Sequence, residues 1–357
     1  MIDENRLIKT FSELTKINSP TGDEKVLADD ILNRLKNLHI ETVKDNYGNI
    51  IAHIGEGSDK ILLSAHLDTV EPGRGIKPII DNGVIKSDGT TILGADNKVA
   101  VASILEVLQV IKEQNVTHQP LDIVFTLSEE EGNYGAINLD YSQITAKSGY
   151  CFDSVAPIGT IVTSAPFYYR FDIKIIGKSA HASRPDQAIN ALTIVGQVIN
   201  QLIQGQIDDV TIMNIGVING GQVRNTVMGE VTLKGEVRSY YEDRIINELN
   251  LIEETLKNIC NQFGGNYELK SVRENGGYVI NRNDTVVVKA IVAINQLQIE
   301  HSFVDSWGCS DANILHEYGI NILNLGDGVE NAHTVDESIR TLDLLKLASL
   351  ILELIRE

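Results

Sequence analysis

Apolar positions in the first part of the chain alternate between short continuous runs and a helical spacing. The continuous runs cover residues 61–65, 121–127 and 149–152, and each has the length of a buried strand. Between the first two runs, residues 95–112 carry apolar side chains at helical spacing, which predicts a helix. Strands that alternate with helices are typical of an α/β domain with a mostly parallel sheet.

An earlier helix is predicted from its start signal. Thr21 and Glu24 have the spacing of a capping box, in which each side chain accepts a backbone hydrogen bond from the other residue. After Glu24, apolar residues recur at helical spacing among polar ones as far as Leu38. We therefore expect a helix that opens with this box.

The pattern changes after Pro166, where apolar and polar residues begin to alternate as in a half-exposed strand. The segments then read as strand, helix, strand, strand, helix and strand, in the order 167–176, 186–204, 210–217, 227–237, 242–263 and 266–272. This β-α-β-β-α-β order is that of a ferredoxin-like α+β domain. About 110 residues form a domain of ordinary size.

The first pattern resumes towards the end of the chain. Residues 285–296 and 339–355 predict helices, and residues 320–325 predict a buried strand between them. The sequence therefore predicts an α/β fold with a discontinuous first domain, residues 1–165 and 276–357, whose mostly parallel mixed sheet is flanked by helices. A ferredoxin-like α+β domain, residues 166–275, is inserted into it.

Composition narrows the range of functions. The 357 residues are 43% hydrophobic and 22% charged, which is ordinary for a globular protein, and the formal net charge is -19. An acidic surface repels nucleic acid and anionic membranes, so we expect neither as a partner. Three widely spaced cysteines and an acidic start, without the basic and apolar regions of a signal peptide, favour the cytoplasm.

Ionisable residues gather where the predicted strands end. The strand over 61–65 runs into His66, the strand over 121–127 into Glu129 and Glu130, and the strand over 149–152 into Asp153. Because ligands collect at the carboxyl ends of strands in open α/β sheets, these side chains are candidates for a common site. Apolar strands that end repeatedly in ionisable residues are costly unless a cation or water compensates them.

Each of these residues also has an ordinary structural explanation. His66 and Asp68 could be a surface pair, and Asp96 could be a helix cap. Asp153 could be a turn residue, and His333 could be merely exposed. The order of the residues along the chain, rather than any single one, points to a metal site.

Taken together, the motifs resemble a known family. The chain is similar to the M20 two-metal metallopeptidases, in particular to the branch of peptidase T, the tripeptide aminopeptidase. The resemblance covers essentially the whole chain through these segments: Ser64-Ala65-His66-Leu67-Asp68-Thr69-Val70, Gly94-Ala95-Asp96-Asn97-Lys98, Glu129-Glu130-Glu131-Gly132, Asp153, Gly177-Lys178-Ser179-Ala180-His181-Ala182, Gly235-Glu236-Val237-Arg238-Ser239, Ser310-Asp311-Ala312-Asn313 and Asn331-Ala332-His333-Thr334.

The resemblance implies five metal ligands. Asp96 resembles the carboxylate that bridges two ions, His66 and Asp153 resemble the other ligands of one ion, and Glu130 and His333 those of the second. Two imidazoles and three carboxylates suit zinc, with cobalt or manganese able to substitute.

The resemblance also implies residues for catalysis and for substrate binding. Glu129 resembles the general base and Asp68 the residue that orients His66. In the inserted domain, which resembles a lid and dimerisation domain, His181 resembles the residue that stabilises the oxyanion. Asn225 and Arg238 resemble residues that hold the substrate, and a guanidinium suits a carboxylate.

The expected activity is that of an aminopeptidase that hydrolyses short peptides, in particular tripeptides. The metal site alone does not select this activity, since it contacts only the reacting amide. A carboxypeptidase or an amidohydrolase of acylated amino acids would use the same residues. A non-catalytic binding protein on the same scaffold is the alternative from another class. A homodimer formed through the inserted domain is also compatible with the resemblance.

Overall fold

The computed structural model describes residues 1–57 and 59–356, and these divide into two compact units. The first unit contains Met1–Thr163, Ile280–Ser306 and Ser310–Glu357, and the second contains Ser164–Val279 and Trp307–Cys309. The second unit thus extends slightly beyond the insertion predicted at residues 166–275. It also takes in residues 307–309, which the sequence pattern assigned to the first domain.

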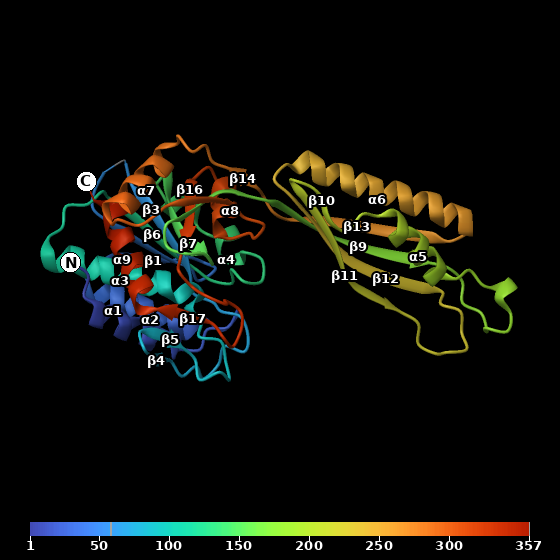
Figure 1. The fold of residues 1–357 in the computed structure, drawn as a ribbon, viewed down its shortest axis with the longest axis horizontal. Coiled ribbons are helices and arrows are strands. Elements are labelled where there is room, and N and C mark those ends of the chain that lie inside the picture. The colour runs from blue at the N-terminus through green and yellow to red at the C-terminus, as the bar shows by residue number, and fades with distance from the viewer. Residues whose placement is uncertain (58, 357) are drawn as a thin grey trace. The chain divides into compact units, whose positions relative to one another are not determined.

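The first unit is built on a mixed sheet with the strand order β1-β2-β6-β3-β7-β16-β8, and β15 pairs with β8 (Figure 1). The central strands β6, β3, β7 and β16 run parallel, whereas the pairs β1–β2, β2–β6 and β16–β8 are antiparallel. The strands are β1 (Glu41–Lys44), β2 (Ile50–Ile54), β3 (Ile61–His66), β6 (Leu121–Thr126), β7 (Ser148–Ser154), β8 (Thr160–Ala165), β15 (Ser302–Asp305) and β16 (Asn321–Gly326). The predicted mixed α/β sheet is confirmed, with parallel pairing confined to its centre.

Helices cover the sheet, and a small antiparallel sheet with the order β17-β5-β4 lies beside it. Helix α3 packs on β3 and β7, and α1 and α9 pack on α3. The helices are α1 (Glu4–Thr15), α2 (Lys25–Asn37), α3 (Ala95–Gln114), α4 (Tyr134–Ile137), α7 (Thr285–Gln296), α8 (Asp311–Glu317) and α9 (Thr341–Ile355), and the small strands are β4 (Ile79–Asp81), β5 (Val84–Lys86) and β17 (Ser338–Arg340).

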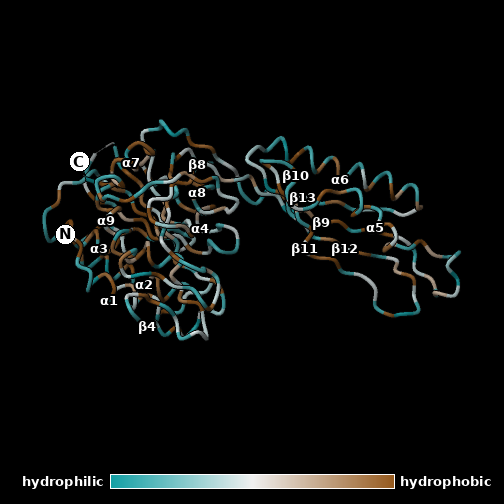
Figure 2. Tube along the Cα trace, in the orientation of Figure 1, coloured by the Kyte–Doolittle hydropathy of each residue, from teal (hydrophilic) through white to brown (hydrophobic). Residues whose placement is uncertain are grey.

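Burial explains why the central strands read as continuous apolar runs. Every residue of β3 and of β6 is buried, because helices or neighbouring chain cover the sheet on both faces. Figure 2 shows hydrophobic segments concentrated inside this unit. His66 is the last residue of β3, at the carboxyl end of the strand.

The second unit has an antiparallel sheet with the order β10-β11-β12-β9-β13. Its elements are β9 (Phe167–Ile176), α5 (Ala191–Gln201), β10 (Gly205–Asp208), β11 (Thr211–Gly220), β12 (Glu230–Ser239), α6 (Glu242–Phe263), β13 (Asn266–Asn275) and β14 (Tyr278–Val279). Helices α5 and α6 pack on each other and on β9 and β12, so one face of the sheet is covered and forms the core. The arrangement is the predicted ferredoxin-like one, extended by the short strand β10.

Two predicted helix starts are wrong. The capping box of Thr21 and Glu24 does not form: α2 begins at Lys25, and Glu24 makes no side-chain cap. The Thr21 hydroxyl donates instead to Asp68, and the Glu24 carboxylate accepts from Ser128. Helix α5 begins at Ala191 rather than near residue 186, because Asn190 caps it by accepting from the Leu192 N–H.

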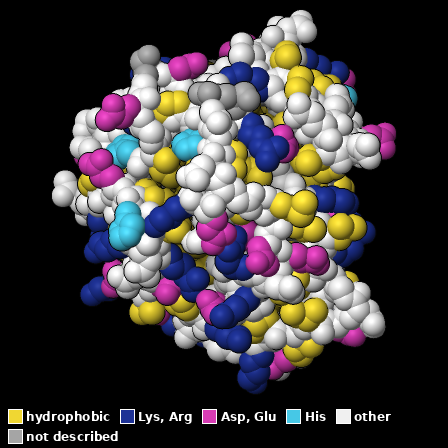
Figure 3. All heavy atoms as spheres, turned by 90° about the vertical axis from the view of Figure 1, so that its left-hand side faces the viewer, with side chains coloured by type: hydrophobic (Ala, Val, Ile, Leu, Met, Phe, Trp, Pro, Cys, Tyr) yellow, Lys and Arg dark blue, Asp and Glu magenta, His cyan; other side chains and the backbone are white. Residues whose placement is uncertain are grey.

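The surface is mixed in charge. On the face that Figure 3 shows, Lys and Arg side chains are interspersed with Asp and Glu, so the acidic excess is not gathered there into one field. In the described part of the chain, no helix is both long enough and apolar enough to cross a membrane.

Candidate metal centre

Chain segments far apart in sequence bring ionisable side chains to one edge of the first unit's sheet. His66 ends β3, Asp153 lies near the end of β7, and Glu130 follows β6. These strands are parallel neighbours, so their carboxyl ends share an edge. Asp96 joins them from the start of α3, and His333 from the loop before β17.

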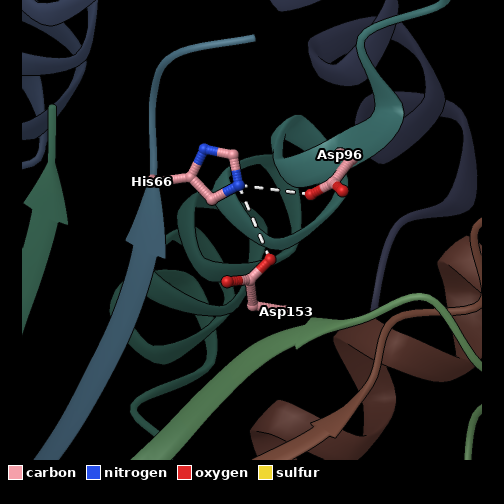
Figure 4. Close-up of side chains that lie close together, drawn as sticks. All are labelled: His66, Asp96 and Asp153. Atoms are coloured by element: carbon pink, nitrogen blue, oxygen red, sulfur yellow. Dashed lines mark hydrogen bonds and ion pairs between the residues drawn. The ribbon is translucent and has the colours of Figure 1, made fainter. Parts of the chain in front are cut away.

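Three side chains form a first group, which Figure 4 shows converging from β3, β7 and the start of α3. The Nε2 atom of His66 lies 3.2 Å from Oδ1 of Asp96 and 3.5 Å from Oδ1 of Asp153. His66 is 2% exposed, and both carboxylates are almost as well covered. One imidazole nitrogen therefore faces two buried carboxylates.

A second group shares Asp96 with the first. The Nε2 atom of His333 lies 3.0 Å from Oε1 of Glu130 and 3.4 Å from Oδ2 of Asp96. In each of the two groups, the candidate ligand atoms all lie within 4.8 Å of one another. Asp96 thus presents one oxygen to each group, as a carboxylate that bridges two cations must.

The pKa shifts within the cluster show that its carboxylates favour positive charge on their neighbours. Asp96 and Glu130 raise the pKa of His333 to about 10, although burial opposes this. Burial alone would raise the pKa of Asp96, but hydrogen bonds from His333 and His66 outweigh it and lower the pKa. Burial raises the pKa of Asp153 to about 7. Divalent cations would compete with protons for these groups.

The donor set fits divalent metal ions. Two imidazole nitrogens and three carboxylates, buried around Asp96 and open to solvent at His333, are ligands that zinc accepts readily and that manganese and cobalt also accept. Several carboxylates at one buried site are unfavourable without a cation, because their charges repel and are poorly solvated. The cluster could therefore hold metal ions, and its geometry allows a pair.

Asp68 connects the His66 strand to the turn that carries the glutamates. The Nδ1 atom of His66 lies 3.0 Å from the backbone carbonyl of Asp68 and 3.3 Å from its carboxylate. The carboxylate of Asp68 accepts the backbone N–H groups of Glu129 and Glu130 at 2.9 and 3.2 Å. Such contacts fix the orientation and tautomer of a ligating histidine. They fix the turn after β6 at the same time.

Glu129 lies beside the cluster without belonging to either group around Asp96. A carboxylate oxygen of Glu129 lies within 4.8 Å of ligand atoms of His66 and Glu130. Burial and then the charge of Asp153 raise the pKa of Glu129 well above its ordinary value. A carboxyl with a raised pKa is suited to accept and return a proton.

The three remaining candidates lie in the second unit. The His181 segment pairs with the Asn225 segment, since the Ala182 N–H donates to the Asn225 carbonyl at 2.9 Å. His181 and Asn225 are exposed. Arg238, on β12, donates to both carboxylate oxygens of Glu236 and to the Trp307 carbonyl, and its guanidinium stacks on Tyr168.

Two buried carboxylates near the cluster were missed by the sequence reasoning. Glu337 accepts the backbone N–H groups of Leu93, Gly94 and Asp96 at 2.7, 2.7 and 3.0 Å, so it holds the loop of the shared carboxylate. Asp327 directly follows β16, the next strand along the same edge, and burial followed by the charge of Asp96 raises its pKa well above the ordinary value. The strand-end position of Asp327 was a usable signal; nothing local marks Glu337.

Comparison with known sequences and structures places this geometry in a family. Residues 62–357 match the family model described as Peptidase family M20/M25/M40. The YqjE protein of Bacillus subtilis strain 168 is 34% identical over 369 residues, which cover 100% of this chain and 99% of YqjE.

Solved structures agree over the whole chain. A tripeptidase from Staphylococcus aureus subsp. aureus Mu50 is similar with a TM-score of 0.97 and 36% identity, covering 100% of this chain and 98% of that one. Aminopeptidase PepT from Bacillus cereus ATCC 10987 has a TM-score of 0.94 and 35% identity, covering 99% and 98%. The chain therefore belongs to peptidase family M20/M25/M40, in its peptidase T-like branch, and is a metallopeptidase that hydrolyses peptide bonds.

Proposed function

We propose that the chain is a two-metal aminopeptidase acting on short peptides, in particular tripeptides. The observation that carries the proposal is the placement of Asp96, whose two oxygens face two separate groups that each contain a histidine and a further carboxylate. The likeness to proteins described as a tripeptidase and as aminopeptidase PepT supports the choice of substrate. Zinc is the proposed ion, with cobalt or manganese as functional substitutes.

The proposed ligand roles follow the two groups. His66 and Asp153 would hold one ion, Glu130 and His333 would hold the other, and Asp96 would bridge them. Asp68 would keep His66 oriented through its contacts with Nδ1. The second unit contributes nothing to this ligand set.

The proposed chemistry assigns proton transfer to Glu129. When bound, the divalent ions would polarise the scissile carbonyl and make the attacking water more acidic. Glu129 accepts the proton of that water and later returns it to the leaving amine, so one carboxyl serves as base and then as acid. Its burial and raised pKa suit a group that must hold a proton between the two steps.

Substrate binding is assigned to the second unit. His181 would donate a hydrogen bond to the developing oxyanion, which is one of the largest contributions available to an enzyme. Arg238 would bind the substrate carboxylate, a role consistent with its present pairing with both oxygens of Glu236. Asn225 would hold the substrate backbone from the segment that pairs with His181.

The choice between an aminopeptidase and its rivals is testable with one pair of substrates. We expect a free tripeptide to be cleaved with a kcat/KM at least roughly 100-fold above that of its N-acetylated form, because a site built to bind a charged amine rejects a neutral amide. The measurement is the initial rate with the zinc-loaded protein. Preference for the acetylated peptide would overturn the aminopeptidase assignment and favour the carboxypeptidase or amidohydrolase alternatives, with the same metal chemistry retained.

A homodimer is the proposed assembly, and mixed subunits test whether His181 acts across it. If His181 serves the site of a partner subunit, His181→Ala and Glu129→Ala proteins should each be inactive. After subunit exchange, a mixture of the two should recover about one quarter of the wild-type rate, as expected for random pairing into closed dimers. Recovery is measured as peptide hydrolysis. No recovery, with exchange verified by differently tagged subunits, would mean that His181 acts within its own chain.

A further inference from the structure

The motif Ser310-Asp311-Ala312-Asn313 and the buried Asn133 have no role in the mechanism described so far. Both lie beside Glu129. We propose that Asn133 and Asp311 are positioning residues that fix the Glu129 carboxylate in its working orientation, an inference that rests on the proposed role of Glu129 as the general base. Among the described residues, Asp311 belongs to none of the candidate ligand groups.

Asn133 is the direct support of Glu129. Its side-chain Nδ2 donates to Oε1 of Glu129 at 2.9 Å, and its backbone N–H donates to the Glu129 carbonyl at 2.8 Å. Asn133 is 2% exposed, so water does not compete for these bonds. The residue has a φ of 57°, in the left-handed region that asparagine tolerates better than most side chains. A single residue thus holds both the backbone and the side chain of Glu129.

The second acceptor of Asn133 settles which way its amide points. The same Nδ2 lies 3.2 Å from Oδ1 of Asp311. Both neighbours are carboxylate oxygens, which accept hydrogen bonds when ionised, and the NH2 group of the amide points towards them. The two hydrogens of that group are then both used. Asn133 stays a donor at any pH at which the enzyme works, because an amide does not titrate.

Asp311 keeps the amide in this position. It is 1% exposed and begins α8, and its other oxygen, Oδ2, accepts from the hydroxyl of Thr126. Thr126 is the last residue of β6, the strand that leads to Glu129. The chain of contacts therefore runs from the end of β6 through Asp311 and Asn133 and returns to Glu129. It closes a loop around the turn that carries the base.

The geometry has a direct consequence for proton transfer. With Oε1 of Glu129 committed to Asn133, Oε2 is the oxygen left to receive the proton of the attacking water. A free carboxylate would rotate between equivalent orientations, and a base acts only from within hydrogen-bond reach of its proton. A carboxylate already fixed in the reactive orientation does not have to lose this rotational freedom during the reaction.

A purely structural role is the competing explanation, because two buried polar residues could simply stabilise the turn. The two explanations differ in how they depend on Glu129. A structural contact stabilises the fold whether or not position 129 carries a base. A positioning contact affects turnover only while Glu129 is present to be positioned.

The test uses Asn133→Gly in the full-length, zinc-loaded protein, because glycine accepts the positive φ and removes the amide. We expect kcat to fall roughly 10–100-fold, the usual effect of losing such a supporting contact, with KM, zinc content and the visible spectrum of the cobalt form unchanged. In a Glu129→Gln background, the same substitution should change the residual rate by less than about 2-fold. Asp311→Asn should lower kcat in the same direction but less, and serves if Asn133→Gly fails to fold.

Asn138→Ala is the matched control, since Asn138 lies five positions further along the chain and its amide donates to the carbonyl of Tyr134. It should leave kcat unchanged. An Asn133→Gly protein with normal kcat, or one that loses activity equally with and without Glu129, would overturn the inference. A Glu129→Gln protein with normal turnover would instead overturn the proposed function itself, so the two failures are distinguishable.

Discussion

Replacing Asp96 with alanine is expected to remove both metal ions and to lower peptide hydrolysis by roughly three orders of magnitude or more. The reason is that Asp96 presents Oδ1 to His66 and Oδ2 to His333, so each ion would lose a ligand at once. Zinc per chain, measured after gel filtration, should fall from about two to well below one. Added zinc should raise the unfolding temperature of the wild type but not of the variant.

Two further variants separate the bridging role from simple damage. His333→Ala touches only one group and should leave about one ion per chain, held by His66, Asp153 and Asp96. Asp88→Ala removes a carboxylate from the same segment, where it pairs with Lys77 and the hydroxyl of Thr90, and should leave both ions bound. If Asp96→Ala kept two ions with normal affinity, the bridging assignment would be wrong.

The sequence predicts those features of the site that come from strand ends. His66, Glu130 and Asp153 lie at or just after the ends of buried apolar runs, the positions from which a side chain reaches the ligand-binding edge of an open α/β sheet. Because these neighbouring strands run parallel, their carboxyl ends lie at the same edge of the sheet. The mixed α/β sheet and the ferredoxin-like insertion follow from the same patterns of burial.

The supporting polar contacts could not be predicted in this way, because each joins residues distant in sequence. Thr21 and Glu24 look like a capping box, yet their side chains bond to Asp68 and Ser128 and leave α2 uncapped. The two side chains bond to residues distant in sequence instead of to the helix start. The reason is that buried carboxylates and turn N–H groups need hydrogen-bond partners wherever they lie. Glu337 likewise holds a loop about 240 positions earlier in the chain, and no periodicity predicts that.

The boundary of the insertion shows the same limit. Residues 307–309 belong to the second unit, although they are separated from it by almost thirty residues of the first. The backbone carbonyl of Trp307 accepts a hydrogen bond from Arg238. The centroid of the Trp307 ring lies 4.6 Å from that of the Tyr240 ring. A contact made by a backbone carbonyl has no sequence signature, since any residue could supply it.

Replacing Glu129 with glutamine is the change that most directly tests the mechanism. Glutamine keeps the shape of the side chain and an oxygen that can accept from Asn133, but it cannot take a proton from water. We expect kcat to fall roughly 10²–10⁴-fold, the range that a general base supplies, with KM little changed. Zinc should remain at about two ions per chain, because Glu129 belongs to neither group around Asp96.

The zinc content of the Glu129→Gln variant decides whether Glu129 is a metal ligand or a general base. Glu129 lies within 4.8 Å of ligand atoms of His66 and Glu130, near enough for a carboxylate to act as a ligand instead of a base. If Glu129 is a ligand, replacing it with a neutral side chain should release one ion. If it is a base, both ions should stay bound and only proton transfer should be lost. Exposed Glu131→Gln, one residue beyond the pair, is the matched control and should retain both ions and full turnover. Full metal with lost turnover assigns Glu129 as the base, and lost metal makes it a ligand.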